Sequence, residues 1–405
     1  MSGSRPVLFA PITPARSAFA GIFAVTLLGL LTIGATLPVL PRYVQGPIGA
    51  GDVAVGVVVG IYAVTGLACR PLAGRLADAQ GRKRVVVGGS LLTALAGLLY
   101  LVPAGVPGLI VARLVLGIGE GAVYTAGAAW VVDLAPAAQR GRIIGLYGLA
   151  IWGGLSFGPP IGELLYRISS YELVWAFAAA APLLGALIAS RIPSDVEAGA
   201  RTPFRSGGLI AREAVGPGAA LALGSIGFAA LAAFIVLHVD ERGIGHGGLV
   251  FTVFALTVVA MRVVGGGFPD RYGPARCAAA AGLAEAAGLL MIAFAGSLPA
   301  VLIGAVAMGA AFSILFPALA LLVVNRVPEQ RRGIAMGTFT AFFDLGVGLG
   351  APIAGIAASL GGYGASFAFA AAAAVGTAAW ALMLGRRLGA VAGPTRELSA
   401  SKVGT

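Results

Sequence analysis

Residues 74–84, GRLADAQGRKR, place a glycine, an aspartate, a second glycine and three successive basic residues between two long apolar runs. A related stretch, GGFPDRYGPAR, occupies residues 266–276. The spacing of 192 residues that separates the two also relates flanking positions, over more than ninety residues without a gap. The matched positions are Arg70 and Arg262, Gly74 and Gly266, Asp78 and Asp270, Gly81 and Gly273, Pro107 and Pro299, Gly117 and Gly309, Pro136 and Pro328, Arg140 and Arg332, Gly158 and Gly350, and Pro160 and Pro352. Because Asp, Arg and Pro recur as well as the abundant Gly, the chain is predicted to be a tandem repeat of two similar halves.

The composition is that of a membrane protein. Of the 405 residues, 59% are hydrophobic and 11% are charged, and the mean hydropathy is +0.96. Soluble domains are nearer half apolar and a quarter charged, so an ordinary soluble enzyme and a disordered chain are both excluded. The net charge of +11 is spread between apolar runs and forms no patch, so no nucleic-acid partner is expected.

Apolar runs broken by charge, Gly or Pro predict an all-α protein with twelve membrane-spanning helices, each of about 20 residues. We expect a six-helix bundle over 17–190, a polar cytoplasmic linker over 191–213 and a second six-helix bundle over 214–388. The expected spans are 18–41, 53–72, 84–102, 108–132, 142–164, 173–190, 214–238, 248–267, 277–295, 300–324, 334–358 and 364–385. Two parallel six-helix repeats are typical of a secondary transporter.

Basic residues fix the predicted orientation. Of the 27 Lys and Arg, 21 lie in the two termini, the central linker and the loops on the same side, whereas the opposite side holds Arg42, Arg167 and Arg242. Loops rich in Lys and Arg stay in the cytoplasm. We therefore expect a multi-pass protein of the cell (inner) membrane with both termini cytoplasmic.

The 74–84 loop resembles the signature loop of the major facilitator superfamily, in which Gly, three residues, Asp, Gly and basic residues follow each other. Ala79 departs from this pattern, because the family usually has a basic residue at that position. The second copy has the basic residue there, Arg271. The resemblance implies that Asp78 meets the N-terminus of the eleventh span and closes the cytoplasmic side in one state only. Alternatively, the basic residues only hold the loop inside. The expected gating residues are Gly74, Asp78, Gly81, Arg82, Asp270 and Arg271.

The fourth span holds Arg113, Gly117, Glu120 and Tyr124, spaced four, three and four residues apart and therefore on one helix face. Arg113 is similar to the arginine that proton-coupled members of the superfamily carry in this span. A carboxylate inside a membrane is costly when charged, so Glu120 is the expected proton carrier, with Arg113 tuning it. A permanent structural Arg–Glu pair is the alternative.

The fifth span reads GLSFGPPIGE over residues 154–163 and resembles the motif of the exporter branches of the superfamily, Gly-x-x-x-Gly-Pro-x-x-Gly-Gly. The matching positions are Gly154, Gly158, Pro159 and Gly162, and Glu163 replaces the final Gly. The resemblance implies that this packed, kinked helix favours export over uptake. Small residues four apart also permit close helix contact, and a packing role alone is the other interpretation.

Further candidates lie in other spans. Asp344, in the eleventh span, occupies the repeat position of Trp152 and is the second candidate for proton coupling. Glu285, in the ninth span, is rated lower because the family architecture makes that span peripheral. His238 and His246 are expected in an ordinary solvated loop. Candidate substrate contacts are Tyr62, Tyr124, Tyr147, Trp152, Phe342 and Phe343, although aromatic residues also pack without a ligand.

The chain is thus identified as a member of the major facilitator superfamily, in the drug:proton antiporter and sugar-efflux-like branch, over about residues 18–386. This resemblance implies proton-coupled efflux of a small amphiphilic compound or drug by alternating access, without enzymatic activity. The expected partners are the substrate, protons and the lipid bilayer, and the expected state is a monomer. No Walker loop, Cys/His metal spacing or nucleophile elbow is found, so no cofactor and no metal are expected. A proton-coupled importer, a sugar or metabolite transporter on the same fold, and a transport-dead sensor remain alternatives.

Overall fold

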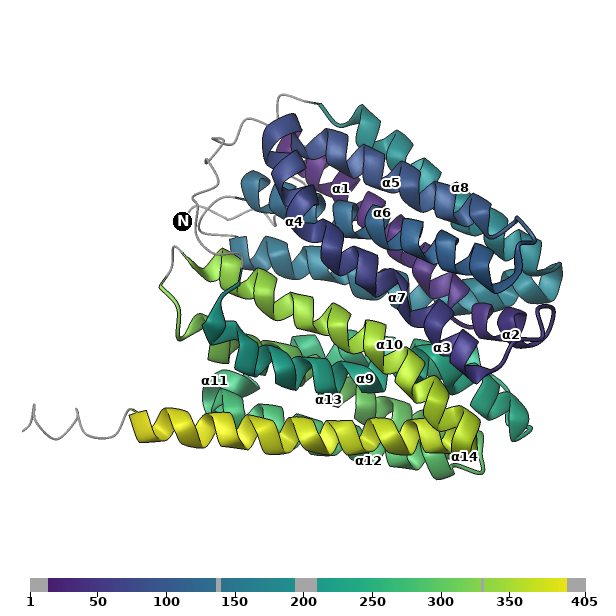
Figure 1. The fold of residues 1–405 in the computed structure, drawn as a ribbon. Helices are drawn as coiled ribbons and strands as arrows, with labels where there is room; N and C mark the ends of the chain where they lie inside the picture. The colour runs from purple at the N-terminus through teal and green to yellow at the C-terminus, as the bar shows by residue number, and fades with distance from the viewer. Residues whose placement is uncertain (1–13, 136–139, 194–209, 329–330, 392–405) are drawn as a thin grey trace, which may run out of the picture.

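The computed structural model describes residues 14–135, 140–193, 210–328 and 331–391, and every regular element in these ranges is a helix (Figure 1). The helices of the first half are α1 (Pro14–Thr36), α2 (Leu40–Gln45), α3 (Asp52–Gly60), α4 (Tyr62–Gln80), α5 (Arg82–Leu99), α6 (Gly105–Leu134), α7 (Arg140–Ile168) and α8 (Tyr171–Arg191). Those of the second half are α9 (Arg212–Glu241), α10 (Gly247–Gly265), α11 (Phe268–Tyr272), α12 (Pro274–Phe294), α13 (Leu298–Val324) and α14 (Arg332–Val391).

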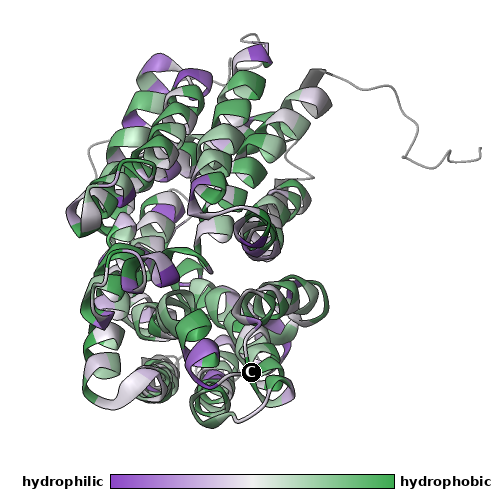
Figure 2. Ribbon diagram, turned by 90° about the vertical axis from the view of Figure 1, so that its right-hand side faces the viewer, coloured by the Kyte–Doolittle hydropathy of each residue, from purple (hydrophilic) through white to green (hydrophobic). Residues whose placement is uncertain are grey.

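The helices account for the twelve expected spans. The second span consists of α3 and α4, which meet at Ile61, and α14 holds the last two spans on either side of non-helical backbone at Gly361 and Gly362. In the described chain, nine helical stretches are long and apolar enough to cross a membrane, and one of them, Arg332–Arg387, contains these two spans. Hydrophobic residues dominate the helices of both halves (Figure 2). The fold is therefore an all-α membrane fold of two six-helix bundles.

Some helix ends differ from the expected ones. The first span was expected to reach residue 41, but α1 ends at Thr36 and the chain turns before α2. Pro38 and Pro41 lack the N–H that would continue the helix, and the turn is closed by bonds from the Leu37 and Val39 amides to carbonyls three residues earlier. Most of the predicted linker, 194–209, lies outside the described residues.

Each half packs mainly within itself, and Figure 1 draws the first half above the second. In the first half, α1 packs on α7 and α8, and α5 packs on α6 and α8. In the second half, α9 packs on α14, and α12 packs on α13 and α14. The principal contacts between the halves join α3 with α14 and α7 with α10. These two pairs are related by the internal repeat, so the interface between the halves has approximate twofold symmetry.

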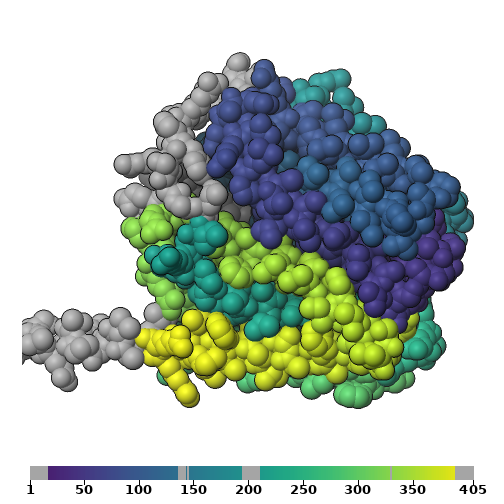
Figure 3. Space-filling model, viewed as in Figure 1, coloured from purple at the N-terminus to yellow at the C-terminus, as the bar shows by residue number. Residues whose placement is uncertain are grey.

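A glycine lies in each of these two contacts between the halves. Gly56 of α3 lies so close to α14 that a Cβ added to it would be 3.0 Å from the Pro352 Cα. The repeat-related Gly248 of α10 faces the Pro159 carbonyl of α7 more loosely, at 3.6 Å from an added Cβ. In the space-filling view, the purple atoms of α2 and α3 lie against the yellow-green atoms of α14 (Figure 3). The α3–α14 contact is therefore the tighter of the two.

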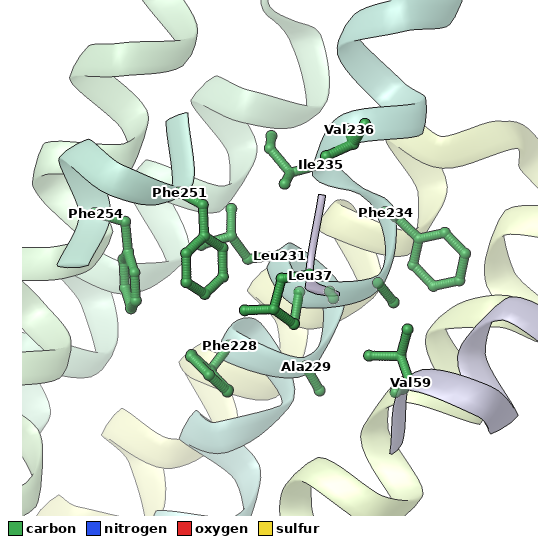
Figure 4. Packing of buried hydrophobic residues seen from close by; sticks show 14 of the residues in the cluster. Leu37, Val59, Phe228, Ala229, Leu231, Phe234, Ile235, Val236, Phe251 and Phe254 are labelled. Atoms are coloured by element: carbon green, nitrogen blue, oxygen red, sulfur yellow. The ribbon is translucent and has the colours of Figure 1, made fainter. Parts of the chain in front are cut away.

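A hydrophobic core fills the same end of the molecule. Leu37 and Val59 from the first half belong to one buried cluster with Phe228, Leu231 and Phe254 from the second half (Figure 4). Burying apolar side chains here cannot exclude much water in a bilayer, so close packing and dispersion are what hold the halves together. We call this end of the helices, where α2 lies, the α2 end. The opposite end is the motif end, where residues 74–84, expected as a loop, form the last turns of α4, Gly81 and the start of α5.

Candidate functional site

An ionic cluster joins the two halves at the α2 end. The Arg42 guanidinium is 2.7 Å from a carboxylate oxygen of Asp240, at the end of α9, and 2.7 Å from one of Glu163, in α7. Burial lowers the pKa of Arg42, but hydrogen bonds and attraction from Asp240 and Glu163 outweigh it and hold that pKa above its usual value. Beside this cluster, the Gln45 amide nitrogen donates to the Tyr363 hydroxyl at 2.7 Å. Polar contacts thus reinforce the apolar contact between the halves at this end.

At the motif end, the gating residues of the first half bond to one another. Asp78 and Asp133 both pair with Arg82, the latter at 3.3 Å. These three groups border a surface pocket of about 700 Å³. In this structure the Asp78 carboxylate therefore contacts the first residue of α5, whereas the resemblance implies the start of the eleventh span.

The two glycines of the repeated loop have the same conformation. Gly81 has φ of 97° and Gly273 has φ of 88°, a region that favours glycine, and each one directly precedes a helix. The recurrence of glycine here therefore has a backbone cause in both copies. Asp270 and Arg271 lie on the short α11, and the Arg271 guanidinium is 5.3 Å from the ring of Tyr272. Gly74 lies in α4, and an added Cβ would meet only Thr125, at 3.8 Å.

Arg113 is fully buried in α6 and bonds to the backbone of α3. Its guanidinium donates to the Val58 carbonyl at 2.9 Å and to the Val59 carbonyl at 2.5 Å. It also lies 4.5 Å from the centre of the Tyr62 ring. Two carbonyls at the end of α3 therefore accept hydrogen bonds from Arg113 at the junction with α4, while its Nη1 has no hydrogen-bond partner among the described residues.

Glu120 lies two turns further along α6 and is not paired with Arg113. The residue is 8% exposed, and its described hydrogen bond is a long one, 3.5 Å between the carboxylate and the Thr93 hydroxyl of α5. Gly29 of α1 provides the space, since an added Cβ there would lie 2.6 Å from the carboxylate. The predicted helix stripe is present, but its two charged members contact different helices.

Asp344 of α14 and Arg70 of α4 form an ion pair between the halves, with 2.9 Å between Arg70 Nη2 and Asp344 Oδ2. The Asp344 side chain is 8% exposed and that of Arg70 is 25% exposed. The Arg70 guanidinium also lies 5.0 Å from the centre of the Tyr124 ring. Sequence reasoning had marked Arg70 only as a repeat position, although an arginine inside an apolar run is itself a signal for a functional site.

The repeat-related pair on the other side of the interface is Arg262 of α10 and Trp152 of α7. The Arg262 guanidinium lies 5.5 Å from the centre of the Trp152 ring, which in turn packs edge-on against Phe312 at 5.7 Å. Phe343 joins this aromatic group, 6.2 Å from Phe312. Arginine therefore faces aspartate in one contact between the halves and tryptophan in the equivalent one.

The remaining aromatic candidates lie inside the halves. Tyr147 is buried, and its hydroxyl is 2.9 Å from that of Thr26 in α1. Phe342 of α14 packs on Gly218 of α9. Tyr62, Tyr124 and Trp152 are thus the candidates that lie against Arg113, Arg70 and Arg262, and Phe343 joins the aromatic group beside Trp152.

The glycines of the fifth-span motif face α1. A Cβ added to Gly158 would lie 2.5 Å from the Gly34 Cα, and one added to Gly154 would lie 2.8 Å from the Leu31 nitrogen. Gly162 packs equally closely on Ala35. The helix continues through Pro159 and Pro160 to Ile168. Close packing of α7 on α1 is therefore one role of this motif.

Two groups differ from what the sequence led us to expect. His238 was expected in a solvated loop, but it is fully buried in α9, with its Nε2 2.8 Å from the Ile292 carbonyl, because α9 continues to Glu241. His246 is exposed, as expected. Glu285 is fully buried, and neither carboxylate oxygen has a hydrogen-bond partner among the described residues. Its side chain faces Gly227 of α9.

The comparisons with known proteins agree on one family. The model of the Major Facilitator Superfamily matches residues 22–247 and 218–403. An uncharacterized MFS-type transporter of Salmonella typhimurium is 38% identical over 364 residues, covering 87% of this chain and 93% of its own. Another, of Burkholderia mallei, is 34% identical over 393 residues, covering 93% and 96%.

Solved structures show the same fold. A mutant of the nucleoside transporter NupG superposes with a TM-score of 0.77 at 13% identity, covering 91% of this chain and 99% of its own. The human organic anion transporter MFSD10 superposes with a TM-score of 0.67 at 20% identity, covering 91% and 100%. At these identities the likeness concerns the fold alone. Together with the family model and the close relatives, it leads to one conclusion: the chain belongs to the Major Facilitator Superfamily of membrane transporters.

Proposed function

We propose that this transporter couples the export of a small amphiphilic compound to proton entry, by alternating access in the cell membrane. The observation that carries the proposal is the ion pair between Arg70 and Asp344, which joins the two halves. The motif of the fifth span and Arg113 support the antiporter branch through their resemblance to the exporters.

The state of the interface fits this cycle. With the basic loops in the cytoplasm, the α2 end faces outward, and it is there that Arg42, Asp240 and the Gly56 contact hold the halves together. Asp78 meanwhile bonds to Arg82 in its own half. We interpret this arrangement as the state of the cycle that is closed to the outside and receives a compound from the cytoplasm.

Asp344 is well placed to respond to a proton. A buried carboxylate is costly to keep charged unless it is paired, and here its partner belongs to the other half. Protonation would cancel the attraction and leave the Arg70 guanidinium without its counter-ion in a half-buried place. Separating the halves would then allow water to reach Arg70, so proton binding would favour the change of state.

Glu120 is the second carboxyl in this proposal. It is buried and weakly hydrogen-bonded, so a proton would also lower the free-energy cost of burying its charge. Its described contacts, however, lie within the first half. A proton on Glu120 would therefore act on the packing of α1, α5 and α6. Asp344 acts on the interface directly, and for this reason we place it before Glu120.

The test uses the full-length protein in proteoliposomes that contain a pH-sensitive dye, with an amphiphilic compound identified by thermal stabilisation of the protein. Export coupled to proton entry requires that the compound and protons move in opposite directions. Asp344→Asn should abolish the compound-driven proton movement while the compound still stabilises the protein, and Glu120→Gln should reduce that movement only in part. Movement in the same direction would instead identify an importer. Full loss in Glu120→Gln with normal Asp344→Asn would move the proton site to α6.

A further inference from the structure

The repeat leaves one cation uncompensated at the interface between the halves. Arg70 and Arg262 are repeat partners, and so are Asp344 and Trp152. Arg70 is neutralised by Asp344, but Arg262 has the face of Trp152 in the equivalent place. Among the described residues, no carboxylate lies within ion-pair distance of Arg262. The two equivalent contacts therefore differ by one negative charge.

Arg262 is also accessible to a ligand. Its side chain is exposed. It contacts Trp152, which belongs to the other half and is only 9% exposed. An arginine that served only to anchor α10 at the membrane surface would turn toward water and the lipid headgroups. This guanidinium instead crosses to the opposite half, and stacking on an indole leaves its N–H donors in the ring plane free to bind an acid.

The surroundings of Trp152 are apolar and aromatic. The indole packs edge-on against Phe312, and Phe312 lies 5.9 Å from both Phe228 and Phe254. A ligand at Arg262 would thus meet one positive charge next to a group of aromatic rings. Such a surface matches a molecule with an acidic group attached to a flat apolar body.

We propose that Arg262 and Trp152 form the subsite for the acidic group of an amphiphilic organic anion, which supplies the negative charge that Asp344 supplies in the equivalent contact. The inference rests on the proposed export function and narrows its substrate class. The carboxylate or sulfonate binds the guanidinium of Arg262, and the apolar body lies beside Trp152 and Phe312. Binding the anion pulls α10 and α7 together, as the Arg70–Asp344 pair does for α4 and α14.

The test compares probes that share an aromatic body and carry an anionic, a neutral or a cationic substituent. The full chain in lipid nanodiscs is incubated with 2-naphthoate, 2-naphthalenemethanol or 2-naphthylmethylamine, and with the corresponding phenyl and biphenyl series, and its thermal stability is measured. A ligand that binds the native state raises that stability. We expect at least one acid to stabilise the protein more than the alcohol and the amine of its series. Preference for the amines, or no stabilisation by any acid, would overturn the proposal.

The variants locate the charge preference. Arg262→Gln should weaken binding of the stabilising acid by about tenfold or more and leave the alcohol unaffected. Trp152→Asp, which copies the equivalent contact, should neutralise Arg262 internally and cause the same loss. Arg276→Gln, an exposed arginine in α12, removes the same charge elsewhere and should change nothing. An acid preference that survives in both Arg262→Gln and Trp152→Asp would overturn the proposal. If a variant does not fold, the wild-type probe series still tests whether the protein prefers acids.

Failure of this inference can be distinguished from failure of the export function. The stability measurement involves no proton gradient, so an acid preference that depends on Arg262 would stand even if no proton moved in proteoliposomes. Conversely, proton movement driven by the amines and not by the acids would keep the coupling and remove the subsite.

Discussion

Arg42 of α2 and Asp240 of α9 form an ion pair of 2.7 Å that ties the first half of the transporter to the second at the α2 end. Glu163 binds the same guanidinium from α7. Glu163 stands where the exporter motif ends in glycine, and the repeat-related position in α14 is Gly355, which packs on the backbone of Val53. The departure from the motif thus adds a second carboxylate, from the first half itself, to the arginine that pairs with Asp240, whereas the repeat-related Gly355 makes a close backbone contact across the interface.

Removing this ion pair should open the α2 end more often. Arg42→Gln deletes both contacts of the guanidinium, but only the pair with Asp240 joins the halves, and losing about 1 kcal/mol there should shift the equilibrium about fivefold toward the outward-open state. The measurement is the rate at which an impermeant thiol reagent labels a cysteine placed at Val59, in a background without Cys69 and Cys277. Arg167→Gln, which breaks only the pair between Arg167 and Glu163 within α7, should leave the rate unchanged. An unchanged rate in Arg42→Gln would contradict a gating role.

Asp78→Asn should impair transport while the protein still reaches the membrane. Asp78 bonds to Arg82 here, and closing the motif end would require a new contact with the start of the eleventh span. The readout is transport in proteoliposomes together with cross-linking from the 74–84 loop to Gly333. Asp133→Asn is the matched control, since it also loses a bond to Arg82 but lies outside the loop. Normal transport by Asp78→Asn would leave the loop with its topological role alone.

Gly158→Ala should destabilise the first half. The added methyl group would lie 2.5 Å from the Gly34 Cα, so α7 and α1 must separate, at a cost of about 1–3 kcal/mol. Gly148→Ala in the same helix meets nothing within 4 Å and serves as the control. Thermal unfolding of the two purified variants in the same detergent makes the comparison. Equal stability would show that α7 does not depend on this contact.

Cysteines introduced at Arg201 and Arg205 should resist an impermeant thiol reagent added outside intact cells, whereas one at Glu241 should react. The expectation follows from the 21 basic residues on the side of the linker and the termini. Permeabilised cells provide the control, since all three cysteines should then be labelled. The reverse pattern would overturn the orientation and, with it, the proposed direction of the observed state.

The sequence predicted the spans well because a membrane helix leaves a long apolar run, whereas its tertiary contacts leave almost no trace. The repeat identified Arg70 and Arg262 as equivalent, and Trp152 and Asp344 as equivalent, but spacing along the chain could not reveal that these residues contact one another. Glu120 and Arg113 show a second limit of reasoning from spacing. They share a helix face, yet each contacts a different neighbouring helix, because a helix of this fold is surrounded by partners. Similarly, His238 is buried because α9 continues to Glu241, and only three-dimensional packing could show this.

The contact of Gly56 with α14 has a mechanical consequence. Two backbones that touch without side chains between them cannot approach further, so the contact acts as a fulcrum near one end of a lever about 30 Å long, the thickness of the hydrocarbon core. Each degree of rotation about such a point moves the far end by ~0.5 Å over that length. In the proposed cycle, the motif end would therefore shut by pivoting about Gly56 while the α2 end stays sealed, and a second movement would separate Gly56 from α14. Between the two movements of the proposed cycle, the transported molecule would be enclosed on both sides.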